Sequence, residues 1–281
     1  MENLERLVNE YQKNIENTKK YFSYTNQVRE YNGYIFKKMR HNDRLENEIK
    51  WLKRLNQIDY NVPKFIGLYE NIIITEKIDG QTIEDTNAHK HFYHIGELIA
   101  NLHNIPVQEN LEWKQNIKLQ YIDLKDSVKD KMPNDIFKVA TNFIEKRLEN
   151  LSNSENVIIH SDIRPENIIY SNGKYYLIDL ENMNIGDREY DFTRILNLLN
   201  EKEFYSYEDF KNLMDGYRSI NHLQLSEERW QLYNKFYAFR IYSRMLCGKI
   251  GQDNKYEKYL KDTLLCENDK VTAWIKKYNE E

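Results

Sequence analysis

The chain has 281 residues, 40% of them hydrophobic and 31% charged, which excludes a disordered protein and allows one large domain or two lobes. Its 45 acidic and 41 basic residues give a net charge of −4, which argues against a strongly basic nucleic-acid binder. The longest aliphatic runs, such as Ile72–Ile74, are too short to cross a membrane, and with no signal core and only two cysteines we expect a cytoplasmic protein.

The first part of the sequence predicts a small α+β lobe. Asn32-Gly33 is a strong signal for a two-residue hairpin turn, because both residues tolerate positive φ. Asn42 and Asp43 precede apolar residues at helical spacing, so we expect one of them to be a helix N-cap. The predicted elements are a helix within 1–20, a hairpin within 21–40, a helix from about 43, and strands at 65–69 and 72–78.

Beyond the turn at Asp79-Gly80 the sequence predicts mainly helices around a β island. Only 9 glycines and 4 prolines occur in the chain, which favours long helices over a large all-β fold. We predict two domains, 1–78 and 79–281, that meet at this turn. The predicted elements are helices at 92–102 and at 117–150 with a break near Pro133, strands at 157–159, 168–170 and 175–178, and helices from about 190, the last at 255–278.

The segment from Val157 to Asp191 carries the residues that indicate chemistry. A predicted strand ends at His160, a polar loop then presents Asp162 and Asn167, and the second strand of a hairpin ends at Asp179. A carboxylate beside a strand end can accept a proton from a hydroxyl group. Amide and carboxylate oxygens are ligands that suit Mg²⁺. One base and two metal ligands are the parts that phosphoryl transfer requires.

These motifs resemble a known family. The loop His160-Ser-Asp162-Ile-Arg-Pro-Glu-Asn167, followed by Ile178-Asp179-Leu-Glu181, is similar to the His-x-Asp-x-x-x-x-Asn and Ile-Asp patterns of the aminoglycoside phosphotransferase and choline kinase superfamily. The resemblance implies a bilobal α+β fold of the protein-kinase type, with a small N-terminal sheet lobe and a large, mainly helical C-terminal lobe. It also implies ATP, or another nucleoside triphosphate, and Mg²⁺ as cofactors, and a hydroxylated small molecule as the phosphate acceptor.

The resemblance also implies a role for each polar residue of this segment. Asp162 would be the catalytic base, and Asn167 and Asp179 would hold Mg²⁺. Glu181 follows Asp179 by two residues, as in choline-kinase-like members of the superfamily in which it also serves the metal. A solvated role for Glu181 is equally open.

The small lobe would bind the phosphates of the nucleotide. Lys37 at the end of a hairpin strand would hold the α- and β-phosphates, and Glu48 on the next helix would position it. Lys38 and Glu46 are their rivals. We favour Lys37 because alternation along the strand places it on the same face as Ile35, and Glu48 because it has the family's spacing to the following leucine.

Further nucleotide contacts are implied on either side of these residues. Asn26 matches an asparagine near the nucleotide loop of the family, and the segment from Glu76 to Ile78 resembles its hinge, on which adenine would lie. The candidate nucleotide loop, residues 23–27, contains no glycine. Contact between its backbone and the phosphates is therefore an open question.

The acceptor is expected to be a cationic small molecule, such as an aminoglycoside or a choline-like amino alcohol. The candidate contacts are the acid Glu227, the aromatic residues Trp230 and Tyr233, and the loop residue Arg164. Acids attract a cation by charge and aromatic faces by their quadrupole. The alternatives are that the acids are solvated and that the aromatic residues pack in the core.

Two other functions stay open. A non-catalytic kinase-like protein would normally lack the base or a metal ligand, and this sequence has both. A Ser/Thr protein kinase would have Phe-Gly after Asp179 and a later Ala-Pro-Glu, and neither is present. We expect no nucleic-acid partner and no membrane, and the sequence does not indicate an oligomeric state.

Overall fold

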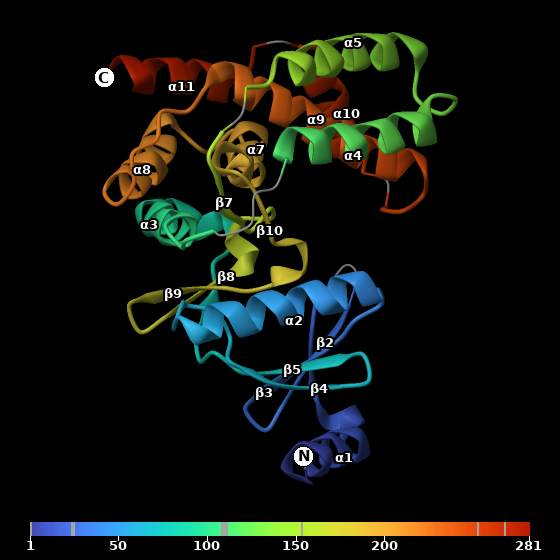
Figure 1. Ribbon diagram of the computed structural model, residues 1–281, viewed down its shortest axis with the longest axis vertical. Coiled ribbons are helices and arrows are strands. Elements are labelled where there is room, and N and C mark those ends of the chain that lie inside the picture. The colour runs from blue at the N-terminus through green and yellow to red at the C-terminus, as the bar shows by residue number, and fades with distance from the viewer. Residues whose placement is uncertain (1, 24–25, 108–111, 153, 252, 267) are drawn as a thin grey trace. The chain divides into compact units, whose positions relative to one another are not determined.

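The computed structural model describes residues 2–23, 26–107, 112–152, 154–251, 253–266 and 268–281 (Figure 1). Contacts within the chain divide it into two compact units, which we name unit 1 and unit 2. Unit 1 comprises Met1–Asn87 and Pro165–Met183, and unit 2 comprises Ala88–Arg164 and Asn184–Glu281. Both units are discontinuous in sequence, whereas the predicted domains, 1–78 and 79–281, are continuous, and that domain assignment stays a prediction.

Unit 1 is built on an antiparallel sheet of five strands in the order β1-β2-β3-β5-β4. The hairpin of β2 and β3 turns at Asn32-Gly33, where φ is 47° and 78°, so the predicted hairpin is confirmed. Successive side chains of β3 point to opposite faces, which separates Phe36 from Lys37. The strands are β1 (Lys19–Tyr21), β2 (Gln27–Tyr31), β3 (Tyr34–Lys38), β4 (Phe65–Tyr69) and β5 (Ile72–Glu76).

Two helices pack on opposite faces of this sheet (Figure 1). On one face, the ring of Tyr11 from α1 stacks on the ring of Phe36, with centroids 3.9 Å apart. On the other face, α2 brings Glu48 against Lys37. The helices are α1 (Glu2–Lys13) and α2 (Asn42–Gln57).

The helix predicted within 1–20 is confirmed as α1, whereas the predicted start of α2 is wrong. α1 ends at Lys13, because the chain then makes a 3₁₀ turn and enters β1, which pairs with β2. The N-cap of α2 is His41, not Asn42 or Asp43. The backbone of His41 is extended, with φ −123° and ψ 125°, so the helix begins one residue earlier than its polar residues suggest.

A second, three-stranded sheet of unit 1 has the order β6-β8-β9. Asn172-Gly173, with φ of 48° and 80°, forms the predicted turn between β8 and β9. The single β island that the sequence predicts is wrong, because β7 pairs with β10 in unit 2, and neither β6 nor β10 was predicted. The strands of the two sheets are β6 (Gln81–Thr82), β8 (Ile168–Ser171) and β9 (Lys174–Leu177) in unit 1, and β7 (Asn156–Ile159) and β10 (Asn184–Asp187) in unit 2.

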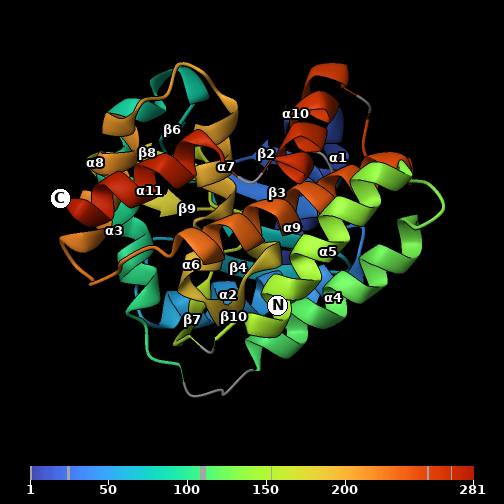
Figure 2. The same ribbon diagram turned by 90° about the horizontal axis from the view of Figure 1, so that it is seen from above.

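Unit 2 is mainly helical, as predicted. α9 is its central helix and packs against α4, α5, α7, α10 and α11 (Figure 2). The break near Pro133 is confirmed, since this residue is the N-cap of α5. The helices are α3 (Phe92–His103), α4 (Trp113–Val128), α5 (Asn134–Asn150), α6 (Arg188–Asp191), α7 (Thr193–Glu201), α8 (Tyr207–Arg218), α9 (Glu227–Leu246), α10 (Asn254–Leu265) and α11 (Lys270–Glu280).

The prediction of one continuous helix at 255–278 is wrong, because the segment forms two helices, α10 and α11. They separate because Asp269 has an extended backbone and its carboxylate accepts a hydrogen bond from the amide of Thr272, which caps α11. Among the helices in the described ranges, none combines the length and the apolar character that a membrane span requires.

Candidate active site

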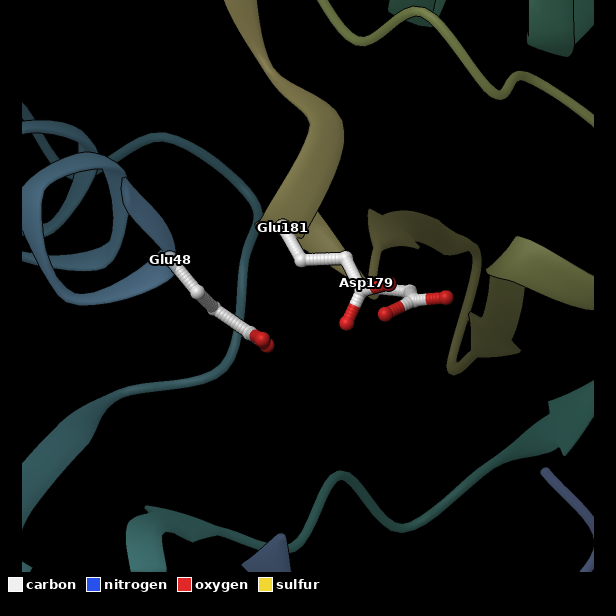
Figure 3. A group of neighbouring side chains, drawn as sticks. All are labelled: Glu48, Asp179 and Glu181. Carbon is white, nitrogen blue, oxygen red and sulfur yellow. The ribbon is translucent and has the colours of Figure 1, made fainter. Parts of the chain in front are cut away.

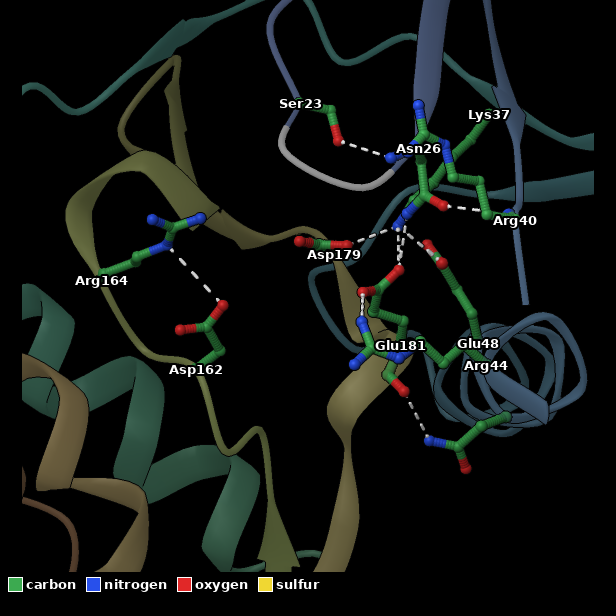
Figure 4. A network of polar contacts seen from close by, with 11 residues as sticks. Ser23, Asn26, Lys37, Arg40, Arg44, Glu48, Asp162, Arg164, Asp179 and Glu181 are labelled. Atoms are coloured by element: carbon green, nitrogen blue, oxygen red, sulfur yellow. Dashed lines mark hydrogen bonds and ion pairs between the residues drawn. The ribbon is translucent and has the colours of Figure 1, made fainter. Parts of the chain in front are cut away.

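Lys37 lies at the centre of a buried ionic cluster in unit 1 (Figure 4). Its Nζ donates a 2.7 Å hydrogen bond to Oε2 of Glu48 on α2, and it also donates to the carboxylate of Asp179, which follows β9. Oε2 of Glu181 lies 3.6 Å from the same nitrogen. The side chain of Lys37 is 12% exposed. The structure therefore brings Lys37, and not Lys38, together with Glu48, and not Glu46.

Burial and charge act in opposite directions on this cluster. Burial favours the neutral amine of Lys37, but the carboxylates of Glu48, Asp179 and Glu181 outweigh it and raise the pKa of Lys37 above its ordinary value. Burial raises the pKa of Glu48 to about 7, although Lys37 opposes this shift. The lysine is therefore a permanent cation, as a group that binds phosphates must be.

Three carboxylates of unit 1 form a candidate metal site (Figure 3). One oxygen from each of Glu48, Asp179 and Glu181 lies within 4.8 Å of the others. Hard oxygen donors of this kind suit Mg²⁺, so the donor set fits the ion that the resemblance implies. The buried Asn167 accepts a 3.0 Å hydrogen bond from the amide of Ile178 through its backbone carbonyl, which ties it to the residue next to Asp179.

Asp179 itself has a left-handed backbone, with φ 63° and ψ 58°, and begins the 3₁₀ turn Leu180–Asn182. Aspartate and asparagine tolerate this conformation better than other residues with a side chain. The turn follows shortly after β9, and the carboxylates of both Asp179 and Glu181 lie beside Lys37.

Glu181 is held by a second set of contacts (Figure 4). Nδ2 of Asn26 donates to its Oε2 at 2.7 Å, and Nη1 of Arg44 donates to its Oε1 at 2.6 Å. Asn47 donates to its backbone carbonyl at 3.0 Å. The side chain is only 4% exposed, so the solvated role left open for Glu181 is wrong. It is a buried carboxylate that joins the segment after β9 to α2 and to Asn26.

Sequence reasoning missed Arg44 and Asn47. A signal for both was present, because residues three and four apart share a helix face. Arg44 precedes Glu48 by four residues on α2, and Asn47 follows Arg44 by three. A search of the face that carries Glu48 would have found Arg44, and a search around Arg44 would then have found Asn47.

The remaining residues predicted to contact the nucleotide are Glu76, Ile78 and the loop at 23–27. The amide of Glu76 at the end of β5 donates to the carbonyl of Lys64 at 2.9 Å, and its exposed carboxylate lies 3.7 Å from the ammonium of Lys64. Ile78 is half-buried. The adenine contact of Glu76 and Ile78 stays a prediction. The predicted nucleotide loop, 23–27, contains residues 24–25, which lie outside the described residues.

In unit 2, the loop after β7 presents Asp162. Both oxygens of the buried Asp191 fix this loop, because they accept hydrogen bonds from the amides of His160 at 2.9 Å and Ser161 at 2.6 Å. The side chain of Asp162 is 22% exposed, and Nε of Arg164 lies 3.7 Å from its Oδ2 (Figure 4). The carboxylate is held on a fixed loop and is accessible, as a general base must be.

The predicted acceptor residues of α9 are occupied elsewhere. Trp230 is 4% exposed and donates to Asp269 at 3.2 Å, and Tyr233 is fully buried and donates to Asp187 at 2.6 Å. Glu227 is a half-buried residue of the first turn of α9. The burial of the two aromatic residues favours the alternative of core packing, and their contact with an acceptor stays a prediction.

Comparisons with known proteins place this geometry in a family. The model of the phosphotransferase enzyme family matches residues 8–217, more than half of the chain. The chain belongs to this family. The predicted resemblance is thereby confirmed, and with it the prediction that the chain is an enzyme of the phosphotransferase type. No curated protein sequence matches the chain.

Solved structures of other phosphotransferases have a similar fold. A choline/ethanolamine kinase family protein from Mesorhizobium loti matches with a TM-score of 0.72 and 15% identity, over 94% of this chain and 92% of that one. The choline kinase LicA from Streptococcus pneumoniae matches with a TM-score of 0.66 and 21% identity, over 90% and 96%. A phosphotransferase in a ternary complex with streptomycin and ATP matches with a TM-score of 0.67 and 15% identity, over 93% and 98%. The predicted kinase-like α+β fold is confirmed.

Proposed function

We propose that this member of the phosphotransferase enzyme family transfers the γ-phosphate of ATP to a hydroxyl group of a small molecule. The observation that carries the proposal is the contact of Lys37 with both Glu48, 11 residues away in the sequence, and Asp179, 142 residues away. A lysine held in this way is the phosphate-binding part of a kinase site. The similar structure that contains ATP supports this nucleotide as the donor.

The proposed roles divide between the two units. In unit 1, Lys37 binds the α- and β-phosphates, Glu48 holds Lys37 in place, and Asn167 and Asp179 hold Mg²⁺. When bound, Mg²⁺ would neutralise charge on the phosphates. In unit 2, Asp162 accepts the proton of the acceptor hydroxyl group while the oxygen of that hydroxyl group forms a bond to the γ-phosphorus. The bond from that phosphorus to the bridging oxygen of ADP breaks, so the products are ADP and a phosphate ester.

We also propose a small acceptor, an adenine site and a third metal ligand. An acceptor of small size fits the similar proteins, whose printed names include choline kinase and a complex with streptomycin. Adenine on the segment from Glu76 to Ile78 and Glu181 as a third metal ligand are proposed on the resemblance. A cytoplasmic location is proposed on the low cysteine content, and the absence of nucleic-acid and membrane partners on the net charge of −4 and the short aliphatic runs.

Replacement of the base tests the chemical step. Asp162→Asn should keep the fold and the affinity for ATP with Mg²⁺, and should lower kcat by about 10²–10⁴-fold, which is what a positioned base contributes. ADP release in the presence of a screened acceptor measures kcat. Glu166→Gln is the matched control, because Glu166 is an exposed acid of the same loop.

The same experiment separates the proposal from its rivals. Unchanged turnover in Asp162→Asn would remove the base assignment. Binding of ATP with no ADP release from any alcohol, while a protein substrate is phosphorylated, would favour the protein kinase. Nucleotide binding with no turnover on either kind of acceptor would favour the non-catalytic protein.

A further inference from the structure

The charges around Asp162 are the opposite of those that a cationic acceptor requires. Nε of Arg194 on α7 lies 3.3 Å from Oδ1 of Asp162, and Nε of Arg164 lies 3.7 Å from Oδ2. Arg240 on α9 belongs to the same group, because its guanidinium and that of Arg194 lie over one ring, Tyr237, at 5.6 Å and 5.2 Å. One carboxylate therefore lies within 4 Å of two arginines, and its charge also acts on the third, Arg240.

Tyrosines hold two of these arginines in place. Arg194 donates to the hydroxyl of Tyr237, which lies 3.2 Å from the hydroxyl of Tyr256. Arg240 donates a 3.4 Å hydrogen bond to the hydroxyl of Tyr190. Aromatic faces and phenol oxygens orient a guanidinium but carry no negative charge that would neutralise it. The group keeps its positive charge.

Two of the arginines also have unused hydrogen-bond donors. Nε of Arg164 and Nε of Arg240 are buried and have no hydrogen-bond partner among the described residues. Among the described residues, Asp162 supplies the carboxylate that lies within 4 Å of these arginines. Its distance of 3.7 Å to Nε of Arg164 is too long for a hydrogen bond. Arginine stays protonated in proteins, so a buried guanidinium calls for an anion.

We propose that the acceptor carries an anionic group, a carboxylate or a phosphate, which Arg194 and Arg240 bind while its hydroxyl is presented to Asp162. A guanidinium can pair with either anion through two parallel N–H groups. This inference rests on the proposed kinase function and replaces the cationic acceptor expected from the sequence, because arginines repel an ammonium group.

Four sugars that share one scaffold test the charge of the acceptor. They are glucosamine, glucose, glucuronate and glucose 6-phosphate, which carry a cation, no charge, a carboxylate and a phosphate. With ATP and Mg²⁺, kcat/KM from ADP release should be at least about tenfold higher for one or both anionic sugars than for glucose. Glucuronate and glucose 6-phosphate distinguish a carboxylate from a phosphate acceptor. Preference for glucosamine or glucose would overturn the inference and leave the kinase function standing.

Variants of Arg194 test which residue recognises the anion. Arg194→Gln should reduce the preference for the anionic sugar over glucose on the order of 10- to 100-fold, the value of a hydrogen bond to a charged group, and Arg194→Lys should restore part of it. Arg147→Gln is the matched control, because Arg147 also lies over an aromatic ring, Phe143, at 4.9 Å. If Arg194 only held Asp162 in place, kcat would fall equally for all four sugars and the preference would not change.

Calorimetry without nucleotide keeps this inference separate from the proposed function. Glucuronate or glucose 6-phosphate should bind to the wild type and to Lys37→Met, and should bind much more weakly to Arg194→Gln. Such binding without phosphorylation would support the anion site and contradict the kinase proposal. Loss of binding in Lys37→Met but not in Arg194→Gln would place the anion at the nucleotide site and overturn the inference, as would no binding to the wild type.

Discussion

Two clusters of this enzyme are built from the same ion pairs with opposite excess charge. In unit 1, one cation, Lys37, contacts three acids. In unit 2, one acid, Asp162, lies within 4 Å of Arg164 and Arg194 and interacts electrostatically with Arg240. The excess negative charge of the first cluster favours binding of a cation, such as Mg²⁺. The excess positive charge of the second favours binding of an anion. The net charge of a cluster, and not the presence of ion pairs, therefore indicates which ligand it accepts.

The largest expected effect on ATP affinity comes from replacing the aspartate of each cluster by asparagine. Asp179→Asn should weaken Mg²⁺-dependent ATP binding by more than about 100-fold, since even residues that only support a metal ligand contribute about 10–100-fold. Asparagine suits this position because φ is 63° and alanine would strain the backbone. Asp162→Asn should leave the same affinity within about twofold. Calorimetry with and without Mg²⁺ measures both.

Two results would contradict the separate roles of the two clusters. Equal ATP binding by Asp179→Asn and the wild type would show that the acidic cluster does not hold the metal. An equal loss in both variants would mean that the two carboxylates serve one function, contrary to their different surroundings.

A smaller effect concerns the dependence of stability on pH. Among the described residues, Glu48 in unit 1 and Glu189 in unit 2 are glutamates whose pKa is raised to about 7. Burial, together with Asp187, raises the pKa of Glu189 from 4.5, against the amide of Ser226 and Arg229. A raised carboxyl pKa stabilises the protein below pH 4.5, and this contribution is lost as the pH rises to about 7. Glu189→Gln removes the titration but can still accept the hydrogen bond from Ser226, which is 2.7 Å long.

The stability difference between Glu189→Gln and the wild type should therefore rise with pH. From pH 4.5 to 7 the free energy of unfolding of the variant, relative to that of the wild type, should increase by about 3 kcal/mol, at about 1.4 kcal/mol for each unit of difference in pKa. Above pH 7 the difference should be constant. Urea unfolding at several pH values measures it, with Glu228→Gln as the control, because Glu228 is an exposed acid of α9, its side chain 83% exposed. A difference that does not vary with pH would show that Glu189 is ionised throughout.

Much of unit 1 could be predicted because its signals are local. The Asn32-Gly33 turn fixes the β2–β3 hairpin, and strand alternation then decides between Lys37 and Lys38. The chemistry around Asp179 was recognisable for a similar reason, because it lies in a short motif next to a strand end. Contacts within one or two elements leave a pattern in the sequence.

Unit 2 was harder because its decisive contacts join distant segments. β10 is a four-residue strand that exists only through pairing with β7, and no local pattern marks it. The acceptor charge was inferred from Glu227, Trp230 and Tyr233, which are near one another in sequence. The arginines around Asp162 come from the loop after β7, from α7 and from α9, so only the fold brings them together.

The smallest effect tests whether the acidic cluster depends on its surroundings. Arg44 donates to Glu181 at 2.6 Å, and since the arginine is 31% exposed we expect the pair to contribute only about 1 kcal/mol. Arg44→Met should raise the KM for ATP about fivefold with little change in kcat, because Glu181 loses the contact that positions it beside Lys37. Arg44→Lys should restore part of the effect, and Lys50→Met, an exposed change on the same helix, should have none. The sign of the change is decisive. If Arg44 instead withholds Glu181 from Mg²⁺, its removal would lower the KM, and the acidic cluster would then be a metal site that α2 restrains.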